Sequence, residues 1–118
     1  MKTFLAVYLG SPDSRQHREW NSLDEATRNK RMQEGMAAWH AWGTKHQAQT
    51  VVEGGPLGKT KKISAHGIAD TKNNLSGFTV VKAESAEAAA KMFENHPHFA
   101  IFPGESVEVV EILPIPGR

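Results

Sequence analysis

The stretch Ile68-Ala69-Asp70-Thr71-Lys72-Asn73-Asn74-Leu75-Ser76-Gly77-Phe78 says most about the fold of this chain, because it joins a charged turn to an apolar strand. Residues 78–83 read Phe-Thr-Val-Val-Lys-Ala, a β-compatible run that predicts a strand. Ser85 then predicts the N-cap of a helix, and Pro97 prevents that helix from continuing. The centre of the chain is therefore expected to run from turn to strand to helix.

The N-terminal half predicts a strand, a loop and a long helix. The apolar run over residues 4–9 predicts a strand buried on both faces, and residues 10–21 form a polar loop long enough to act as a lid. Ser22 and Glu25 have the spacing of a capping box at a helix start. The apolar stripe of that helix is expected to face the sheet and consists of Met32, Met36, Trp39 and Gly43.

Two further strands complete the expected sheet. Residues 49–53 predict one strand, the glycines of residues 54–58 predict a bulge, and the ribbon resumes over residues 62–65. Residues 107–113 predict the last strand, which ends at Pro114. The order βαββαβ predicts one ferredoxin-like α+β domain over residues 1–118, with a four-stranded antiparallel sheet.

The two helices of such a domain lie on the same side of the sheet, since its crossovers share one hand. The first and last strands are nevertheless apolar on both faces, as the neighbouring residues Phe4 and Leu5, and Val109 and Val110, illustrate. We expect the uncovered face of the sheet to pack against a second copy, so that the protein is a homodimer.

The pattern Asp70-Thr71-Lys72, Leu75, Gly77 and Phe78, together with Gly55-Pro56-Leu57, resembles the YCII-related family and its DGPF-type branch. This resemblance implies a dimeric α/β-barrel assembly and a small-molecule ligand. Residues 65–68 stand at the branch's Asp-Gly-Pro-Phe signature but read Ala-His-Gly-Ile, so the signature aspartate is absent.

Composition excludes several classes of partner and site. The formal net charge is only +1 and the charges are interspersed, so neither nucleic acid nor a membrane surface is expected as a partner. There is no cysteine, which removes disulfides, thiolate metal sites and cysteine nucleophiles. No apolar run approaches the roughly 20 residues that span a bilayer, and we expect a soluble cytoplasmic protein.

His40 and Asp70 are the predicted catalytic residues. An imidazole at the edge of the predicted helix stripe could donate or accept a proton, and a carboxylate would fix its tautomer. Family members often carry a histidine on this helix, partnered by an aspartate, but ungapped counting from residue 55 places that position at Ala38. The alternative is that His40 is a histidine packed beside the core.

Five further residues are predicted to contact a substrate: Trp39, His46, His66, Lys72 and His98. Each also has a structural interpretation, as a core aromatic residue, a helix C-terminal histidine or a solvated turn residue. The pair His96 and His98 lacks a third ligand at a diagnostic spacing, so we expect neither a metal nor another cofactor. His96 is interpreted as the end of the second helix.

The leading hypothesis is a small-molecule-binding protein that performs cofactor-free proton transfer, such as a lyase or dehydrochlorinase-like elimination. The competing hypothesis is a non-enzymatic metabolite-binding or regulatory dimer. A third, a cofactor-independent monooxygenase, rests on fold analogy alone.

Overall fold

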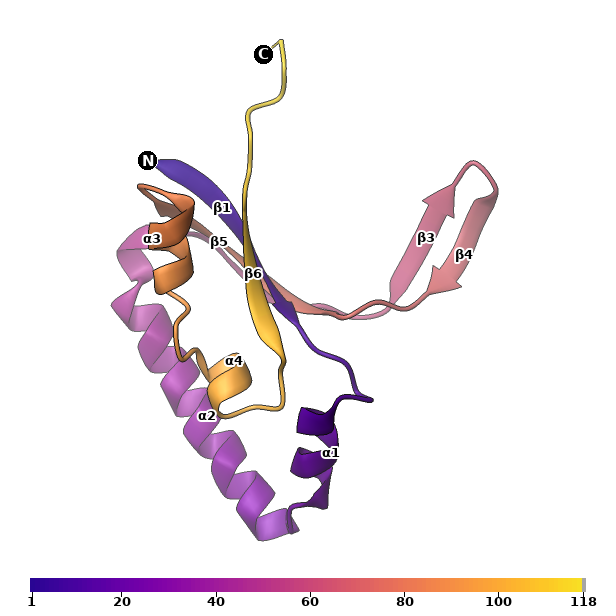
Figure 1. The fold of residues 1–118 in the computed structure, drawn as a ribbon, viewed down its shortest axis with the longest axis vertical. Coiled ribbons are helices and arrows are strands. Elements are labelled where there is room, and N and C mark those ends of the chain that lie inside the picture. The colour runs from indigo at the N-terminus through magenta and orange to yellow at the C-terminus, as the bar shows by residue number, and fades with distance from the viewer. Residues whose placement is uncertain (118) are drawn as a thin grey trace.

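The computed structural model describes residues 1–117 and shows a four-stranded antiparallel sheet with helices packed on one face (Figure 1). The elements are β1 (Lys2–Leu9), α1 (Arg15–Ser22), α2 (Glu25–Lys45), η1 (Gln47–Gln49), β2 (Thr50–Pro56), β3 (Thr60–Ser64), β4 (Gly67–Thr71), β5 (Leu75–Ala83), α3 (Ala86–Lys91), α4 (Pro97–Ala100) and β6 (Ser106–Glu111). The main sheet has the order β2-β5-β1-β6, and β3 pairs with β4 alone. The predicted α+β class and four-stranded antiparallel sheet are confirmed.

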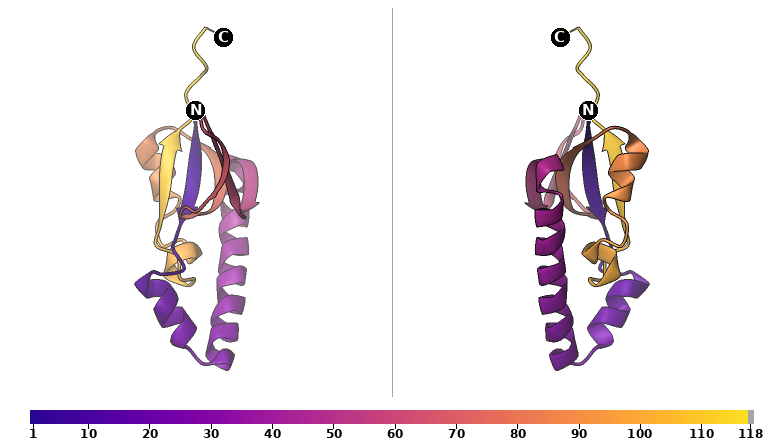
Figure 2. Two further views of the ribbon diagram at one scale, coloured as in Figure 1. Left: turned by 90° about the vertical axis from the view of Figure 1, so that its right-hand side faces the viewer. Right: turned by 90° about the vertical axis from the view of Figure 1, so that its left-hand side faces the viewer.

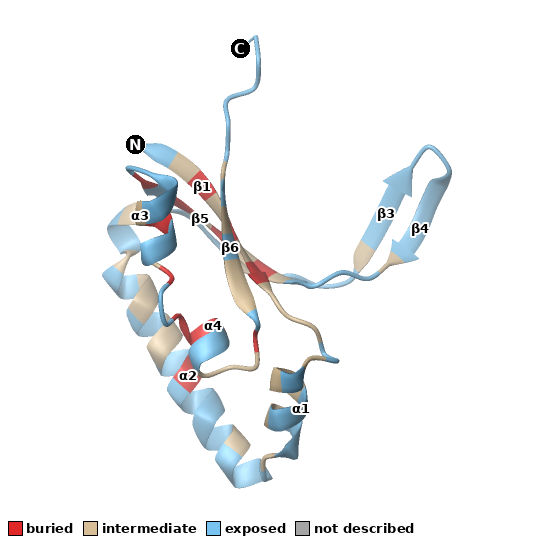
Figure 3. Ribbon diagram, in the orientation of Figure 1, coloured by how far each residue is buried: buried red, intermediate tan, exposed pale blue. Residues whose placement is uncertain are grey.

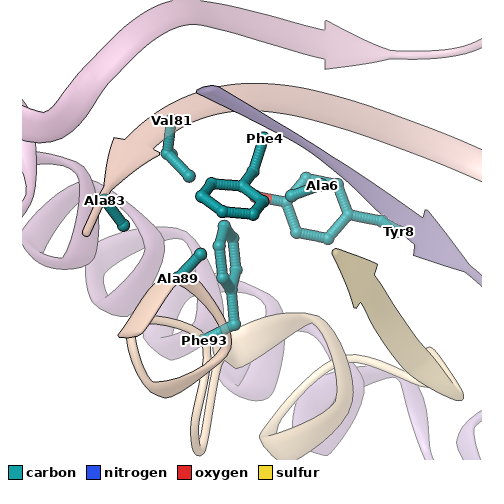
Figure 4. Close-up of a cluster of buried hydrophobic side chains, with 7 residues drawn as sticks. All are labelled: Phe4, Ala6, Tyr8, Val81, Ala83, Ala89 and Phe93. Carbon is teal, nitrogen blue, oxygen red and sulfur yellow. The ribbon is translucent and has the colours of Figure 1, made fainter. Parts of the chain in front are cut away.

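The core lies between the central strands and the helices. Side chains of β1 alternate, so that Phe4, Ala6 and Tyr8 are buried toward the helices while their neighbours are half-exposed. Phe93 and Ala89 pack against them from the α3 side (Figure 4). The predicted stripe of the second helix, including Ala89 and Phe93, therefore does face the sheet.

The segment between β1 and α2 differs from the predicted polar loop. Residues 15–22 form α1, which Ser14 caps by accepting a hydrogen bond from the His17 amide at 3.1 Å. The second helix starts after Asp24, whose carboxylate accepts from the Thr27 amide, and not at the predicted Ser22 cap. Ser22 is instead the last residue of α1, and its hydroxyl donates to the Glu19 carbonyl. The two helices meet in a V beyond the end of the sheet (Figure 2).

This position explains why the predicted stripe of α2 is only partly buried. Met32 and Met36 are 45% and 61% exposed, because the first half of α2 extends past the sheet. The buried residue of this helix is Gly35, against which Phe102 packs. A Cβ at Gly35 would lie 2.5 Å from Phe102 Cε2, so the glycine permits a close approach and does not interrupt the helix.

Two other local predictions were wrong. The ribbon does not resume after the glycines as predicted, since the next segment forms a separate hairpin in which β3 pairs with β4. The predicted bulge at the glycines themselves is confirmed, because the pairing of β2 with β5 shifts register between Val52 and Gly55. Pro97 starts the short helix α4 at a position where the missing N–H costs nothing. His96 is consequently the N-cap of α4 and not the C-terminal residue of the preceding helix.

The face of the sheet away from the helices carries an apolar row. Val110 is directly opposite Leu5, Leu5 is opposite Val80, and Val80 is opposite Val52, so these residues share one face. Val52 and Val110 are 47% and 54% exposed.

Candidate functional site

A cavity of about 410 Å³ lies where β1 leaves the sheet. Five segments bound it: the loop after β1, α1, the residue after β2, the entry to β5, and α4 with the loop that follows it. The residues that give it polar character are His17, Asn73, Ser76 and His98. Its volume falls in the range of small-molecule sites, which run from about 300 to 1,000 Å³.

His98 forms the buried side of this cavity. Its Nε2 lies 2.8 Å from the Leu9 carbonyl oxygen. Because a carbonyl oxygen only accepts, Nε2 carries the proton and Nδ1 has the lone pair. Burial lowers the pKa of His98, although the carbonyl groups of Leu9 and Ser106 act in the opposite direction. The ring is therefore neutral at pH 7 and has the form of a base.

Gly104 fixes where the His98 ring can lie. A Cβ at this position would be 2.3 Å from His98 Nε2 and 2.4 Å from the His98 carbonyl oxygen. The Gly104 amide donates to that same carbonyl at 2.9 Å. Only glycine permits the loop to approach the imidazole so closely.

The opposite side of the cavity is built by local hydrogen bonds. Asn73 accepts from the Leu75 amide at 3.0 Å and donates to the Thr60 hydroxyl at 3.1 Å, which fixes the entry to β5. The Ser14 cap fixes the first turn of α1 and so places His17 beside the cavity. Hydroxyl, amide and imidazole groups thus converge on one space.

A cluster of aromatic rings, comprising Tyr8, Trp39, Trp42, Phe93, His96 and His98, lies behind the cavity. His96 is fully buried, and its Nδ1 accepts from the His98 amide at 3.0 Å as the cap of α4. Burial lowers the pKa of His96 to about 4, with His98 and then His46 acting in the same direction. Its Nε2 has no hydrogen-bond partner among the described residues. His96 therefore acts structurally, as a neutral ring in the core.

The structure places the two predicted catalytic residues on separate elements. His40 is exposed on α2, and Asp70 is exposed on β4, where its carboxylate accepts a hydrogen bond from Lys61. Figure 1 shows α2 and the β3–β4 hairpin on opposite sides of the molecule. The expected place of His40 at the edge of the core is wrong, and one chain does not bring it to Asp70.

Of the five predicted substrate contacts, His98 alone lines this cavity within residues 1–117. His66 and Lys72 are exposed at the tip and base of the hairpin. His46 caps the C-terminal end of α2 as its structural interpretation expected, and its ring packs 4.8 Å from that of Trp42. Trp39 packs in the aromatic cluster, with ring centroids 5.1 Å from Tyr8 and 4.6 Å from His96.

Three residues that line the cavity, His17, Asn73 and Ser76, were not among the site residues predicted from the sequence. His17 was assigned to a loop, because α1 is short and polar, with Trp20 as its one large apolar residue and no buried residue. The Ser14–His17 spacing of a helix cap was the available signal.

Residues 1–117 include no group of three His, Asp or Glu residues positioned to hold a metal ion. None of their helices is long and apolar enough to cross a membrane.

Comparison with known proteins identifies a family and solved structures of similar fold. Residues 15–116 match the family described as the YCII-related domain. The fold is similar to that of 5-chloro-2-hydroxyhydroquinone dehydrochlorinase (TftG) from Burkholderia phenoliruptrix AC1100, solved in complex with 2,5-dihydroxybenzoquinone. The two chains are 23% identical over 91% of this chain and 89% of the other, with a TM-score of 0.50, a likeness that bears on the fold alone. No curated protein matches the chain.

Proposed function

The chain belongs to the YCII-related family, and from this we propose that it binds a small molecule in the cavity beside His98 and catalyses a cofactor-free proton transfer on it. An elimination of the lyase or dehydrochlorinase type is the reaction that such a site suits best. The observation that carries the proposal is the meeting of a neutral, buried His98 with His17 in one polar cavity.

In such an elimination, a neutral imidazole accepts the proton from a carbon of the bound compound. The electron pair of the broken C–H bond forms a double bond, and the leaving group departs with its own pair. The low pKa of His98 favours the base form at pH 7. Ser76 and Asn73 supply short polar contacts that could orient a ring-sized compound.

Binding of 2,5-dihydroxybenzoquinone, the compound in the TftG complex, tests the site by calorimetry. We expect His17→Ala and Ser76→Ala to weaken binding roughly tenfold each, since each removes one hydrogen bond to the compound. His40→Gln and Asp70→Asn are the matched controls, because both residues are exposed away from the cavity, and they should leave the affinity unchanged.

The opposite result would assign the site to the residues predicted from the sequence. If His40→Gln and Asp70→Asn weaken binding while the cavity variants do not, two subunits together form the predicted catalytic pair. Lys72 and His66, which lie near Asp70 in the sequence, would then be the next residues to replace.

A binding role without catalysis is the second candidate. Its support is that, within residues 1–117, none of the residues lining the cavity is acidic, so no carboxylate there orients either histidine. Incubating the protein with halogenated hydroquinones and following halide release separates the two roles. Binding without release, together with unaltered compound in the mixture, would support the non-enzymatic role.

We also propose that two copies associate through the outer face of the sheet. The row formed by Val52, Val80, Leu5 and Val110 is continuous across all four strands, and it has no covering element among the described residues. Burying this apolar surface in a homodimer would be favourable.

A further inference from the structure

The segment 59–72, here named the arm, consists of the β3–β4 hairpin with its flanking lysines. It projects away from the sheet and is exposed along nearly its whole length (Figure 3). Ile63 and Ile68 are directly opposite each other, so they share one face of the arm. They are 73% and 75% exposed.

A two-stranded hairpin of five residues a strand is marginally stable in water on its own. The arm has one ion pair, Lys61 with Asp70, and a hydrogen bond from Asn73 to Thr60 at its base. Neither contact covers the two isoleucines. An exposed apolar pair on a thin projection is typical of a segment that another surface covers.

A groove of about 590 Å³ between α3 and β6 has the complementary character. Its floor is apolar and includes Ala90, Phe93, Val107 and Val109. Its edges carry three glutamates, Glu87, Glu94 and Glu105, and none of its lining residues within 1–117 is basic. Lys91 lies beside it and pairs with Glu87 at 3.9 Å. We call this surface the acidic groove.

We propose that the arm of one copy of this chain docks into the acidic groove of a second copy. The arm has four lysines against one aspartate, so its charge is opposite to that of the groove. Its isoleucine pair matches the apolar floor. The arm and α3 lie on opposite sides of one chain, so the occupant is a second copy (Figure 1). This inference does not rest on the ligand site.

Cysteine cross-linking tests the docking directly, because the natural chain has no cysteine. A tagged Ile63→Cys protein is mixed with an untagged Ala90→Cys protein and oxidised gently. Ala69→Cys replaces Ile63→Cys in the matched control, since residue 69 lies on the other face of the same arm. All three positions are exposed, and circular dichroism verifies that the variants are folded.

We expect the mixed disulfide to form several-fold more with Ile63→Cys than with Ala69→Cys, because a disulfide requires closely spaced Cβ atoms. Raising the salt to about 1 M should reduce the yield, since the exposed lysines and glutamates are then screened. Equal yields from the two arm positions, or no mixed disulfide, would overturn the proposal. Either result could occur while the quinone still binds, so failure here is distinct from failure of the proposed function.

Discussion

His96 is a buried base held neutral, and that makes the protein sensitive to acid. The ring has lost its hydration, and Nδ1 is used as a helix cap. Its pKa in the folded state is about 4, below the usual 6.5. Between these two values the unfolded chain binds the proton more strongly, so stability falls as the pH falls from 6.5 toward 4.

We predict that protonation linked to His96 lowers the free energy of unfolding by about 3 kcal/mol as the pH falls over that range. The figure follows from 1.36 kcal/mol for each unit of pKa difference. His46 and His98 add to the loss, because burial lowers the pKa of each. Urea unfolding followed by tryptophan fluorescence at a series of pH values measures it.

His96→Asn is the matched variant, since an asparagine oxygen can still accept from the His98 amide. It should be less stable at pH 7 because it loses ring packing, yet its stability should depend less on pH. An unchanged pH dependence in this variant would show that His96 does not cause the acid sensitivity.

At the scale of single elements, α2 contains two glycines with opposite surroundings. Gly35 lies against Phe102, whereas a Cβ at Gly43 would meet nothing within 4 Å. We predict that Gly43→Ala stabilises the protein by up to about 1 kcal/mol through helix propensity. Gly35→Ala should be less stable than Gly43→Ala by about 1–3 kcal/mol, because the methyl group displaces a packed ring.

Thermal unfolding by circular dichroism compares the two variants. Because Phe102 also lines the cavity, Gly35→Ala should weaken quinone binding as well, while Gly43→Ala should not. Equal melting temperatures would mean that Phe102 moves aside without cost.

The elements that the sequence predicted well are those that bury side chains. The apolar run over residues 4–9 correctly predicted β1, because its alternate side chains are buried in the core. The Ser85 cap correctly predicted the start of α3, whose Ala89 is buried. The elements α1 and β4 were missed because they are short and mostly polar, and neither buries a residue. The cavity was missed for a different reason, since His17, Ser76 and His98 come from three distant segments and converge only through the fold.

At the scale of the whole molecule, neighbouring valines of β6 should respond differently to charge. Val109 packs against the core, whereas Val110 lies in the outer row. We predict that Val110→Asp stays folded but forms a smaller assembly than the natural protein, because the carboxylate stays hydrated only while that face is uncovered. Val109→Asp should unfold the chain.

Light scattering gives the mass of each variant, and circular dichroism gives its folded state. A Val110→Asp protein with the same mass as the natural protein would contradict association through this face. A monomeric natural protein at micromolar concentration would contradict it as well.

The strand order has a kinetic consequence. Strand β1 is made first, yet both of its partners, β5 and β6, belong to the second half of the chain. During synthesis its apolar residues must wait for most of the polypeptide to emerge from the ribosome, exposed to aggregation and to chaperones. Such distant pairing favours slow folding, on the order of milliseconds to seconds, which stopped-flow refolding would measure.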